Sequence, residues 1–313
     1  MRMSRAARRL APRLLLSWAV GCVILGPLEA HMRWSTGRRS ENIEDRRGVG
    51  MPLVAGGGIG TIVILVLALF FGIDPSVVLQ TGDQAPAPGQ QAPATAPNQR
   101  DELRDFVSVV LADTEDTWHE VFRNMKREYR EPKLVLFTNS VQSACGIAGA
   151  AVGPFYCPGD QKVYLDLGFL RALRERFGAP GDFAQAYVIA HEVGHHVQTL
   201  LGVSERVGEL RRRSRPAEAN ALSVRQELQA DCLAGVWGHH ANRARHILEP
   251  GDLEEALAAA AAIGDDRLQR QAQGRVAPES FTHGTSAQRA RWFQRGFAGG
   301  AVRDCDTFAA SAL

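Results

Sequence analysis

The longest uncharged apolar stretch of the chain is residues 51–73, MPLVAGGGIGTIVILVLALFFGI, which runs for 23 residues. At about 1.5 Å of rise per residue, a helix of this length crosses a hydrocarbon core of roughly 30 Å. Five arginines precede it within residues 33–47, whereas no Lys or Arg follows it before Arg100. The pattern predicts a transmembrane helix, with residues 32–50 as a basic cytoplasmic segment and the rest of the chain on the other side.

A second apolar run, Leu14 to Leu28, follows five arginines and contains Pro27. It resembles the hydrophobic part of a signal peptide, although no clean small-x-small site follows it. Because Met32 comes directly before the basic segment, residues 1–31 are interpreted as an upstream extension or a signal-like segment. A second membrane segment is the remaining alternative.

Periodicity divides the rest of the chain into a linker and a folded domain. Residues 74–100 are rich in Pro, Gln and Ala without hydrophobic periodicity, which indicates a linker. Apolar residues then recur at helical spacing, so a domain is expected over residues 101–313. The runs KLVLF (133–137) and KVYLDL (162–167) suit strands of a small sheet, and helices predominate after Gly178. The predicted fold class is therefore α+β and mainly helical.

One predicted helix carries metal-binding chemistry. In DFAQAYVIAHEVGHHVQTLLG, residues 182–202, His191 and His195 are four apart and lie on one side of the helix. Both imidazoles can therefore reach one tetrahedral zinc at about 2.0–2.1 Å. Glu192 can take a proton from water that the metal activates, as in other HExxH motifs. Burying these three side chains among apolar neighbours would be costly without a metal or partners.

A third ligand is expected further along the chain, because catalytic zinc sites usually combine three protein ligands with one position open to water. In SVRQELQADCLAGVWGHH, residues 223–240, Glu227 and Asp231 are also four apart on a predicted helix. Glu227 is the candidate ligand. Asp231 is the candidate acceptor for the second N–H group of a ligating histidine. The alternative is that both acids lie on a solvated helix face.

These motifs carry a family resemblance. HEVGHH and ELQADCLAG are similar to the HExxH and ExxxD motifs of gluzincin peptidases. With RWSTGRRSENIEDRRG, PFYCPGDQKVYLDL and THGTSAQRARWF, they resemble the neutral zinc metallopeptidase family of bacterial membrane proteins over about residues 32–313. The resemblance implies a zincin-like metallopeptidase domain that follows one membrane anchor and binds one Zn²⁺ ion. The implied ligands are His191, His195 and Glu227, and the implied general base is Glu192.

Further residues could stabilise the oxyanion of such a reaction. His283, in FTHGTSAQRARWF, is the candidate donor, since peptidases of this kind give that task to a His or Tyr. The alternative is that His283 only packs at the start of a helix. Arg289 has the same two interpretations, and Tyr156 and Tyr164 are further candidates for the donor. The strand at residues 162–167 is either the rim of the substrate cleft or a plain structural strand.

Four of the five cysteines lie in the C-terminal two-thirds of the chain, and their even number suggests two disulfides. Cys145 and Cys157 flank a loop of eleven residues, short enough for a local bridge, which leaves Cys232 to pair with Cys305. This is one of three possible connectivities. The spacing contains no CxxC pair, so a structural zinc cluster is not expected.

The composition and net charge of the chain limit the kinds of partner that it is expected to bind. Charged residues make up 22% of the chain and the net charge is +2, so no large field of one sign indicates nucleic acid. The sequence predicts a single-pass cell-membrane protein with its N-terminus in the cytoplasm, a zinc peptidase that hydrolyses peptide bonds of extracytoplasmic proteins or peptides. One alternative is a membrane-tethered zinc module that binds partners without cleaving them. Another is a hydrolase of non-peptide amides such as cell-wall material.

Overall fold

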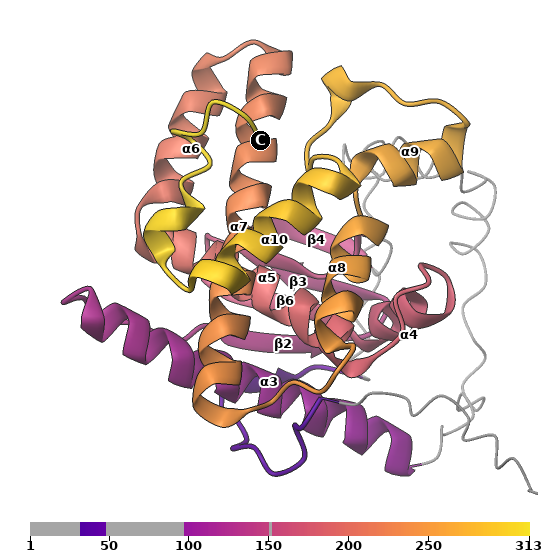
Figure 1. Ribbon diagram of the computed structural model, residues 1–313. Helices are drawn as coiled ribbons and strands as arrows, with labels where there is room; N and C mark the ends of the chain where they lie inside the picture. The colour runs from indigo at the N-terminus through magenta and orange to yellow at the C-terminus, as the bar shows by residue number, and fades with distance from the viewer. Residues whose placement is uncertain (1–31, 48–96, 150–151) are drawn as a thin grey trace, which may run out of the picture.

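The computed structural model describes residues 32–47, 97–149 and 152–313 (Figure 1). Helices make up most of these residues and two small sheets accompany them, so the predicted mainly helical α+β class is confirmed. The elements follow in the order β1 (Ile43–Asp45), α3 (Pro97–Asn124), β2 (Lys133–Phe137), β3 (Ser140–Ser143), β4 (Gly146–Gly149), β5 (Phe155–Cys157), β6 (Lys162–Asp166), α4 (Leu167–Glu175), α5 (Asp182–Leu200), α6 (Val203–Arg213), α7 (Pro216–Arg245), α8 (Asp252–Ala262), α9 (Asp265–Gln273), the 3-10 helix η2 (Pro278–Ser280), α10 (Ser286–Gly299) and the 3-10 helix η3 (Val302–Cys305).

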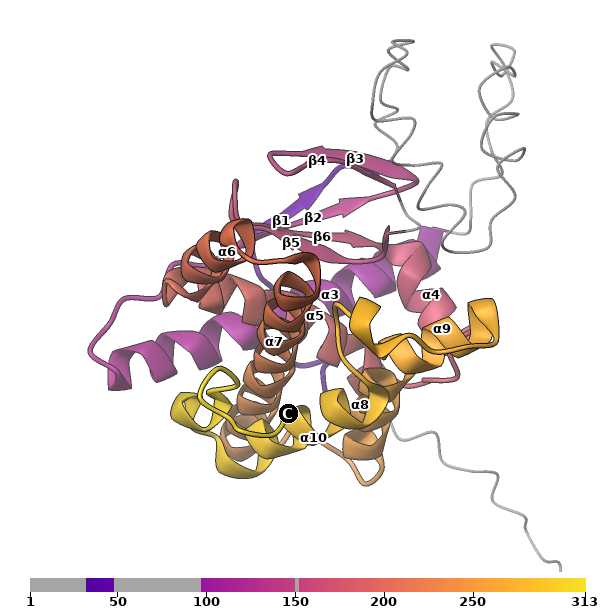
Figure 2. The ribbon, with the colours of Figure 1, turned by 90° about the horizontal axis from the view of Figure 1, so that it is seen from above.

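The larger sheet has the strand order β1-β2-β6-β5, and the hairpin β3-β4 forms a second sheet. β1, β2 and β6 run parallel, whereas β5 is antiparallel to β6. The hairpin lies on one side of the larger sheet, and helices α3, α5 and α7 lie on the other (Figure 2). β6 pairs with β2 along its whole length and with β5 over Lys162–Tyr164, so over these residues it is an internal strand of the sheet. The edge strand next to it is β5.

Residues 32–47 belong to the same folded body as the helices. Met32 is buried, and the ring of Trp34 packs edge-on against Phe106 of α3 with centroids 5.4 Å apart. Arg39 pairs with Asp105 at 2.6 Å, and β1 adds a strand to the sheet. The predicted cytoplasmic placement of residues 32–50, across a membrane from the domain, is therefore wrong for residues 32–47. A strand hydrogen-bonded to the sheet of a domain lies on the same side of any bilayer as that domain.

The predicted single-pass membrane location also needs correction. In the parts of the chain that the structure describes, no helix combines the length and the apolar composition that a membrane crossing requires. The predicted transmembrane helix at residues 51–73 lies outside the described residues. Residues 1–31 and residues 74–96 of the predicted linker lie outside them as well.

α5 is the central helix, and nearly every residue from Phe183 to Val197 is buried. Its close contact with α7 depends on Gly194, where an added Cβ would lie 2.9 Å from the carbonyl oxygen of Ala230. α10 crosses α7 in the same manner, since a Cβ on Gly296 would overlap the carbonyl of Cys232. Glycines thus allow three helix backbones to approach one another around the centre of the domain.

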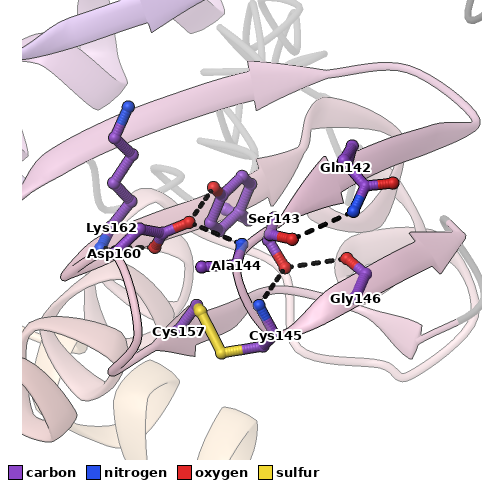
Figure 3. The surroundings of a disulfide bond; sticks show 9 residues. Gln142, Ser143, Ala144, Cys145, Gly146, Cys157, Asp160 and Lys162 are labelled. Carbon is purple, nitrogen blue, oxygen red and sulfur yellow. Dashed lines mark hydrogen bonds between the residues drawn. A yellow bond between two sulfur atoms is a disulfide. The ribbon is translucent and has the colours of Figure 1, made fainter.

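Both expected disulfides are present, and they join Cys145 to Cys157 and Cys232 to Cys305. The first links the turn of the β3-β4 hairpin to the end of β5 (Figure 3). Asp160 secures the same turn by accepting a hydrogen bond from the backbone N–H of Ala144 at 2.9 Å. The second links the middle of α7 to η3. This connectivity is the one of the three that the loop length favoured.

Candidate metal centre

Three side chains from two helices place their ligand atoms around one point. His191 and His195 project from α5, one turn apart, and Glu227 approaches from α7. Nε2 of His191 lies 3.2 Å from Oε2 of Glu227, and Nε2 of His195 lies 3.4 Å from Oε1 of the same carboxylate. One ligand atom from each residue can be chosen so that all three lie within 4.8 Å of one another.

The spacing and chemistry of this donor set fit a zinc ion. Two ligand atoms at about 2.0–2.1 Å from a tetrahedral ion are roughly 3.3 Å apart. Each imidazole lies at about this distance from one of the two carboxylate oxygens of Glu227. Two imidazoles and one carboxylate are also ligands that catalytic zinc sites use, and such a set leaves a fourth position for water. His191, His195 and Glu227 are therefore the residues that would hold the ion.

The charges of these groups favour a cation. Burial opposes the charged form of His191, but the charge and the hydrogen bond of Asp231 outweigh it and raise the pKa of His191 to about 10. Burial also opposes ionisation of Glu227, yet the two histidines hold the pKa of that carboxyl well below its ordinary value. Without a metal, protons on the imidazoles neutralise the acids. A zinc ion would replace those protons, so zinc binding is expected to release them.

Glu192 lies between the two histidines in the sequence and is buried, with 8% of its surface exposed. Burial raises the pKa of its carboxyl above the ordinary value, although the nearby histidines oppose this shift. A carboxylate with a raised pKa is suited to accept a proton near neutral pH and to release it again. The position and environment of Glu192 therefore suit a general base.

Asp231 supports His191 from behind. Its Oδ1 accepts a hydrogen bond from Nδ1 of His191 at 2.8 Å and another from the hydroxyl of Tyr187 at 2.5 Å. Arg289 of α10 donates to both carboxylate oxygens at 3.0 Å. A carboxylate that holds the Nδ1–H group fixes the tautomer in which Nε2 faces a metal. The structure thus brings Asp231 to the histidine that the sequence predicted it would orient.

Gln198 has the equivalent position beside His195, and this role was not predicted from the sequence. Its Oε1 accepts a hydrogen bond from Nδ1 of His195 at 2.9 Å. Its amide nitrogen donates to the carbonyl of Gln226 at 2.7 Å and to the side chain of Gln229 at 3.0 Å, both on α7. The sequence does contain one indication of this contact: Gln198 follows His195 by three positions, and residues three apart lie on the same helix face.

The neighbouring His196 faces away from the ligands. Its Nδ1 accepts from the hydroxyl of Tyr156 at 3.0 Å, and its Nε2 donates to the carbonyl of Arg130 at 2.6 Å. Burial lowers the pKa of His196 to about 4, so the ring is neutral and ties α5 to β5. The hydroxyl of Tyr164 donates to Asp160 at 2.7 Å, on the sheet face opposite α5. Both tyrosine candidates for the oxyanion donor are thus engaged in other contacts.

His283 lies between η2 and α10, and half of its side chain is exposed. Asp265 orders this loop, because its Oδ2 accepts backbone N–H groups from Thr282, His283 and Gly284. Oδ1 of Asp265 lies 3.2 Å from Nδ1 of His283. Burial lowers the pKa of His283, but the Asp265 contact and the charge of Glu227 outweigh it and raise the pKa. The charge of the candidate ligand Glu227 therefore acts on His283.

Fold and site together define a mainly helical α+β domain with a His-His-Glu cluster that could hold a metal. The chain belongs to the family described as "Putative neutral zinc metallopeptidase", whose sequence profile matches residues 32–308. The family predicted from the sequence motifs is therefore confirmed. The name of the family supports zinc as the metal of the His-His-Glu cluster.

Two bacterial relatives extend this finding. "Uncharacterized protein YpfJ" of Escherichia coli strain K12 is 50% identical over 290 residues, which cover 90% of this chain and 100% of the relative. "Uncharacterized protein Rv2575" of Mycobacterium tuberculosis strain H37Rv is 42% identical over 265 residues, which cover 79% of this chain and 86% of the relative. No solved structure matches the chain. The comparisons therefore establish the family.

Proposed function

We propose that this protein is a zinc-dependent peptidase that hydrolyses peptide bonds in proteins or peptides. The observation that carries the proposal is the convergence of His191, His195 and Glu227, with one ligand atom of each within 4.8 Å of the others and the buried carboxylate of Glu192 beside them. A purely metal-binding module needs the three ligands but has no use for a buried glutamate whose pKa is raised. Membership of a zinc metallopeptidase family supports the same function.

The residues of the site divide the chemical work. Zinc, when bound, supplies Lewis-acid polarisation of the scissile carbonyl and lowers the pKa of water toward about 7. Glu192 accepts the proton of the attacking water and passes it to the leaving amine. Asp231 and Gln198 hold the two imidazoles by their Nδ1 atoms, so that both Nε2 atoms stay directed at the metal position.

His283 is proposed as the donor that stabilises the oxyanion. Its Nδ1 faces Asp265, so Nε2 is the nitrogen that can donate to substrate. The half-exposed side chain is accessible to a bound peptide, and the raised pKa of His283 favours the form with both nitrogens protonated. The competing candidates Tyr156 and Tyr164 use their hydroxyls in other hydrogen bonds.

The substrates are proposed to be proteins or peptides of an oxidising compartment. Two disulfides support this proposal, since such bonds form and persist in oxidising surroundings and are rare in the reducing cytosol.

A comparison of the purified full chain with its Glu192→Gln variant on unfolded casein tests the peptidase. The variant is expected to retain zinc and to lose hydrolysis by about 10²- to 10⁴-fold, because only proton transfer is removed. Zinc content is measured in both proteins by metal analysis. Equal hydrolysis by the two proteins would disprove the proposed role of Glu192. Absence of hydrolysis in the zinc-loaded wild type, over a broad set of peptides, would favour a binding module instead.

The oxyanion role is tested by His283→Gln, with Tyr156→Phe as the matched control. Loss of an oxyanion donor is expected to lower kcat by about 10²- to 10³-fold with little change in KM. Tyr156→Phe removes a hydroxyl that binds His196, so kcat is expected to stay near the wild-type value. A larger fall in kcat for Tyr156→Phe than for His283→Gln would transfer the role to the tyrosine.

A further inference from the structure

Four helices meet at one guanidinium group in the interior of the domain. Arg289 of α10 has only 2% of its side chain exposed. Its Nη2 donates to Tyr187 of α5 at 3.2 Å, and its Nη1 donates to the carbonyl of Ile263, directly after α8, at 3.3 Å. Nε and Nη2 both donate to Asp231 of α7 at 3.0 Å. Arg289 therefore joins α5, α7, α8 and α10 through a single charged side chain.

The carboxylate of Asp231 is fully enclosed, with no part of its side chain exposed. A charge in such a place is costly unless it is paired and its lone pairs are used. Arg289 supplies the pairing, and two parallel N–H groups of a guanidinium fix the plane of a carboxylate as well as its position. The remaining contacts of Oδ1, to Tyr187 and His191, are then made in a plane that Arg289 has set.

We propose that Arg289 is a positioning residue for the zinc ligand His191, acting through Asp231. By holding the plane of the Asp231 carboxylate, Arg289 keeps Oδ1 in line with the Nδ1–H group of His191. The imidazole ring is then prevented from rotating about its Cβ–Cγ bond, and Nε2 stays at the metal position. The inference rests on the proposed zinc site but not on catalysis.

A lysine could not replace this function completely. Its ammonium is a point charge on a flexible stem, so it can neutralise Asp231 without fixing the plane of the carboxylate. Charge compensation and orientation can therefore be separated by comparing Arg289→Lys with Arg289→Met.

The competing interpretation is that Arg289 only pins the helices together. The chain contains a matched control for this, because Arg245 of α7 donates through Nε and Nη2 to Asp113 of α3. That pair also joins two helices and is partly buried, but Asp113 contacts neither histidine ligand in the structure. Arg245→Met removes an interhelical arginine fork without touching the support of His191.

The test measures zinc binding to the full-length chain by chelator competition at fixed pH, together with the visible absorption of the cobalt(II)-substituted protein. Arg289→Met is expected to weaken zinc binding about 10- to 100-fold and to alter the cobalt spectrum, as loss of an outer partner of a ligand does. The zinc affinity of Arg289→Lys is expected to lie between that of Arg289→Met and that of the wild type. Arg245→Met is expected to lower thermal stability with zinc affinity unchanged.

Wild-type zinc affinity and cobalt spectrum in a folded Arg289→Met protein would overturn the inference. If that variant does not fold, Arg289→Lys decides, because unchanged zinc affinity there excludes an orienting role. Comparable zinc losses in Arg289→Met and Arg245→Met would show that helix pinning alone matters. Because the readout is metal binding, a wild type that binds zinc but cleaves no peptide would refute the peptidase and leave this inference standing.

Discussion

Two arginine–aspartate pairs in this domain have nearly the same construction and different surroundings. In one, Asp113 of α3 receives Nε and Nη2 of Arg245, and Oδ1 accepts the indole N–H of Trp237 at 2.7 Å. In the other, Asp231 receives Nε and Nη2 of Arg289 and the hydroxyl of an aromatic residue. Each pair is thus a carboxylate held by a guanidinium fork and one aromatic donor.

The difference lies in one further hydrogen bond. Asp231 also accepts from His191, which presents its other nitrogen to the metal position, whereas Asp113 makes no such contact. Asp231 and Arg289 are also almost fully enclosed, whereas 31% of the Arg245 side chain is exposed. The same structural unit therefore stabilises a helix contact in one region and is connected to the proposed chemistry in the other. Experiments that treat the two pairs identically should separate stability from function.

The largest effect is expected from removal of the ligand itself. Glu227→Ala deletes one of the three proposed protein ligands, so zinc affinity should fall well beyond the roughly 10- to 100-fold caused by loss of an outer partner. Metal analysis after dialysis measures the retained zinc. Glu218→Ala, an exposed acid on the same helix paired with Arg215, should keep full zinc content. Stoichiometric zinc in Glu227→Ala would remove this residue from the ligand set.

The next largest effect is expected when the carboxylates of Asp231 and Asp113 are each removed and the two variants are compared. Asp231→Asn leaves a buried guanidinium without its counter-charge and should destabilise the metal-free protein by about 3–5 kcal/mol. Asp113→Asn should cost less, about 1–3 kcal/mol, because its arginine reaches solvent. Only Asp231→Asn should also weaken zinc binding, by about 10- to 100-fold. Urea denaturation and chelator competition provide the two readouts, and a similar zinc loss in both variants would contradict the comparison.

The pH dependence of stability gives a third difference. Burial raises the pKa of Asp231, but Arg289 and His191 outweigh it and lower the pKa to about 2. A group whose pKa is depressed on folding contributes stability above its unfolded pKa, about 3.9, and loses it as the pH falls through the folded value. The contribution is about 2–3 kcal/mol. The gap in unfolding free energy between metal-free wild type and Asp231→Asn should therefore narrow between pH 5 and pH 2.

The smallest effects are expected from the removal of single hydroxyl groups beside the two pairs. Tyr187→Phe removes a hydroxyl that contacts Asp231 and Arg289, and Thr117→Val removes a hydroxyl that contacts Arg245. Each substitution should cost about 1–3 kcal/mol of unfolding free energy. Zinc affinity should fall a few-fold in Tyr187→Phe and remain unchanged in Thr117→Val. A shift in Thr117→Val alone would show that zinc affinity follows overall stability and not the network around Asp231.

Much of the site could be predicted from the sequence because its signals are local. His191 and His195 share a helix, and the predicted segment of residues 182–202 coincides with α5, Asp182–Leu200. The segment predicted around Glu227 lies within the longer α7, Pro216–Arg245. Helix geometry alone places side chains four residues apart on one face, so each half of the site could be recognised separately.

Other parts could not be predicted, because they depend on contacts between segments far apart in the chain. The strand β1 pairs with β2 some ninety positions later, and its basic neighbours had suggested a cytoplasmic flank. Gln198 acts through amide contacts to α7 that its position on α5 does not reveal. Arg289 lies 58 residues after Asp231 and 98 after His191, so no spacing rule connects them.

By itself, the sequence determined that helices form around residues 182–202 and 223–240, which of their side chains can bind a metal, and to which family the chain belongs. Only the tertiary structure decided that the carboxylate of Glu227 meets the two imidazoles, that Asp231 is held by Arg289, and that Tyr156 and Tyr164 are engaged elsewhere. The physical reason is that helix periodicity is set by bonds within one segment. The approach of α5, α7 and α10 depends instead on close packing at positions such as Gly194 and Gly296, where a single added carbon would hold the helices apart.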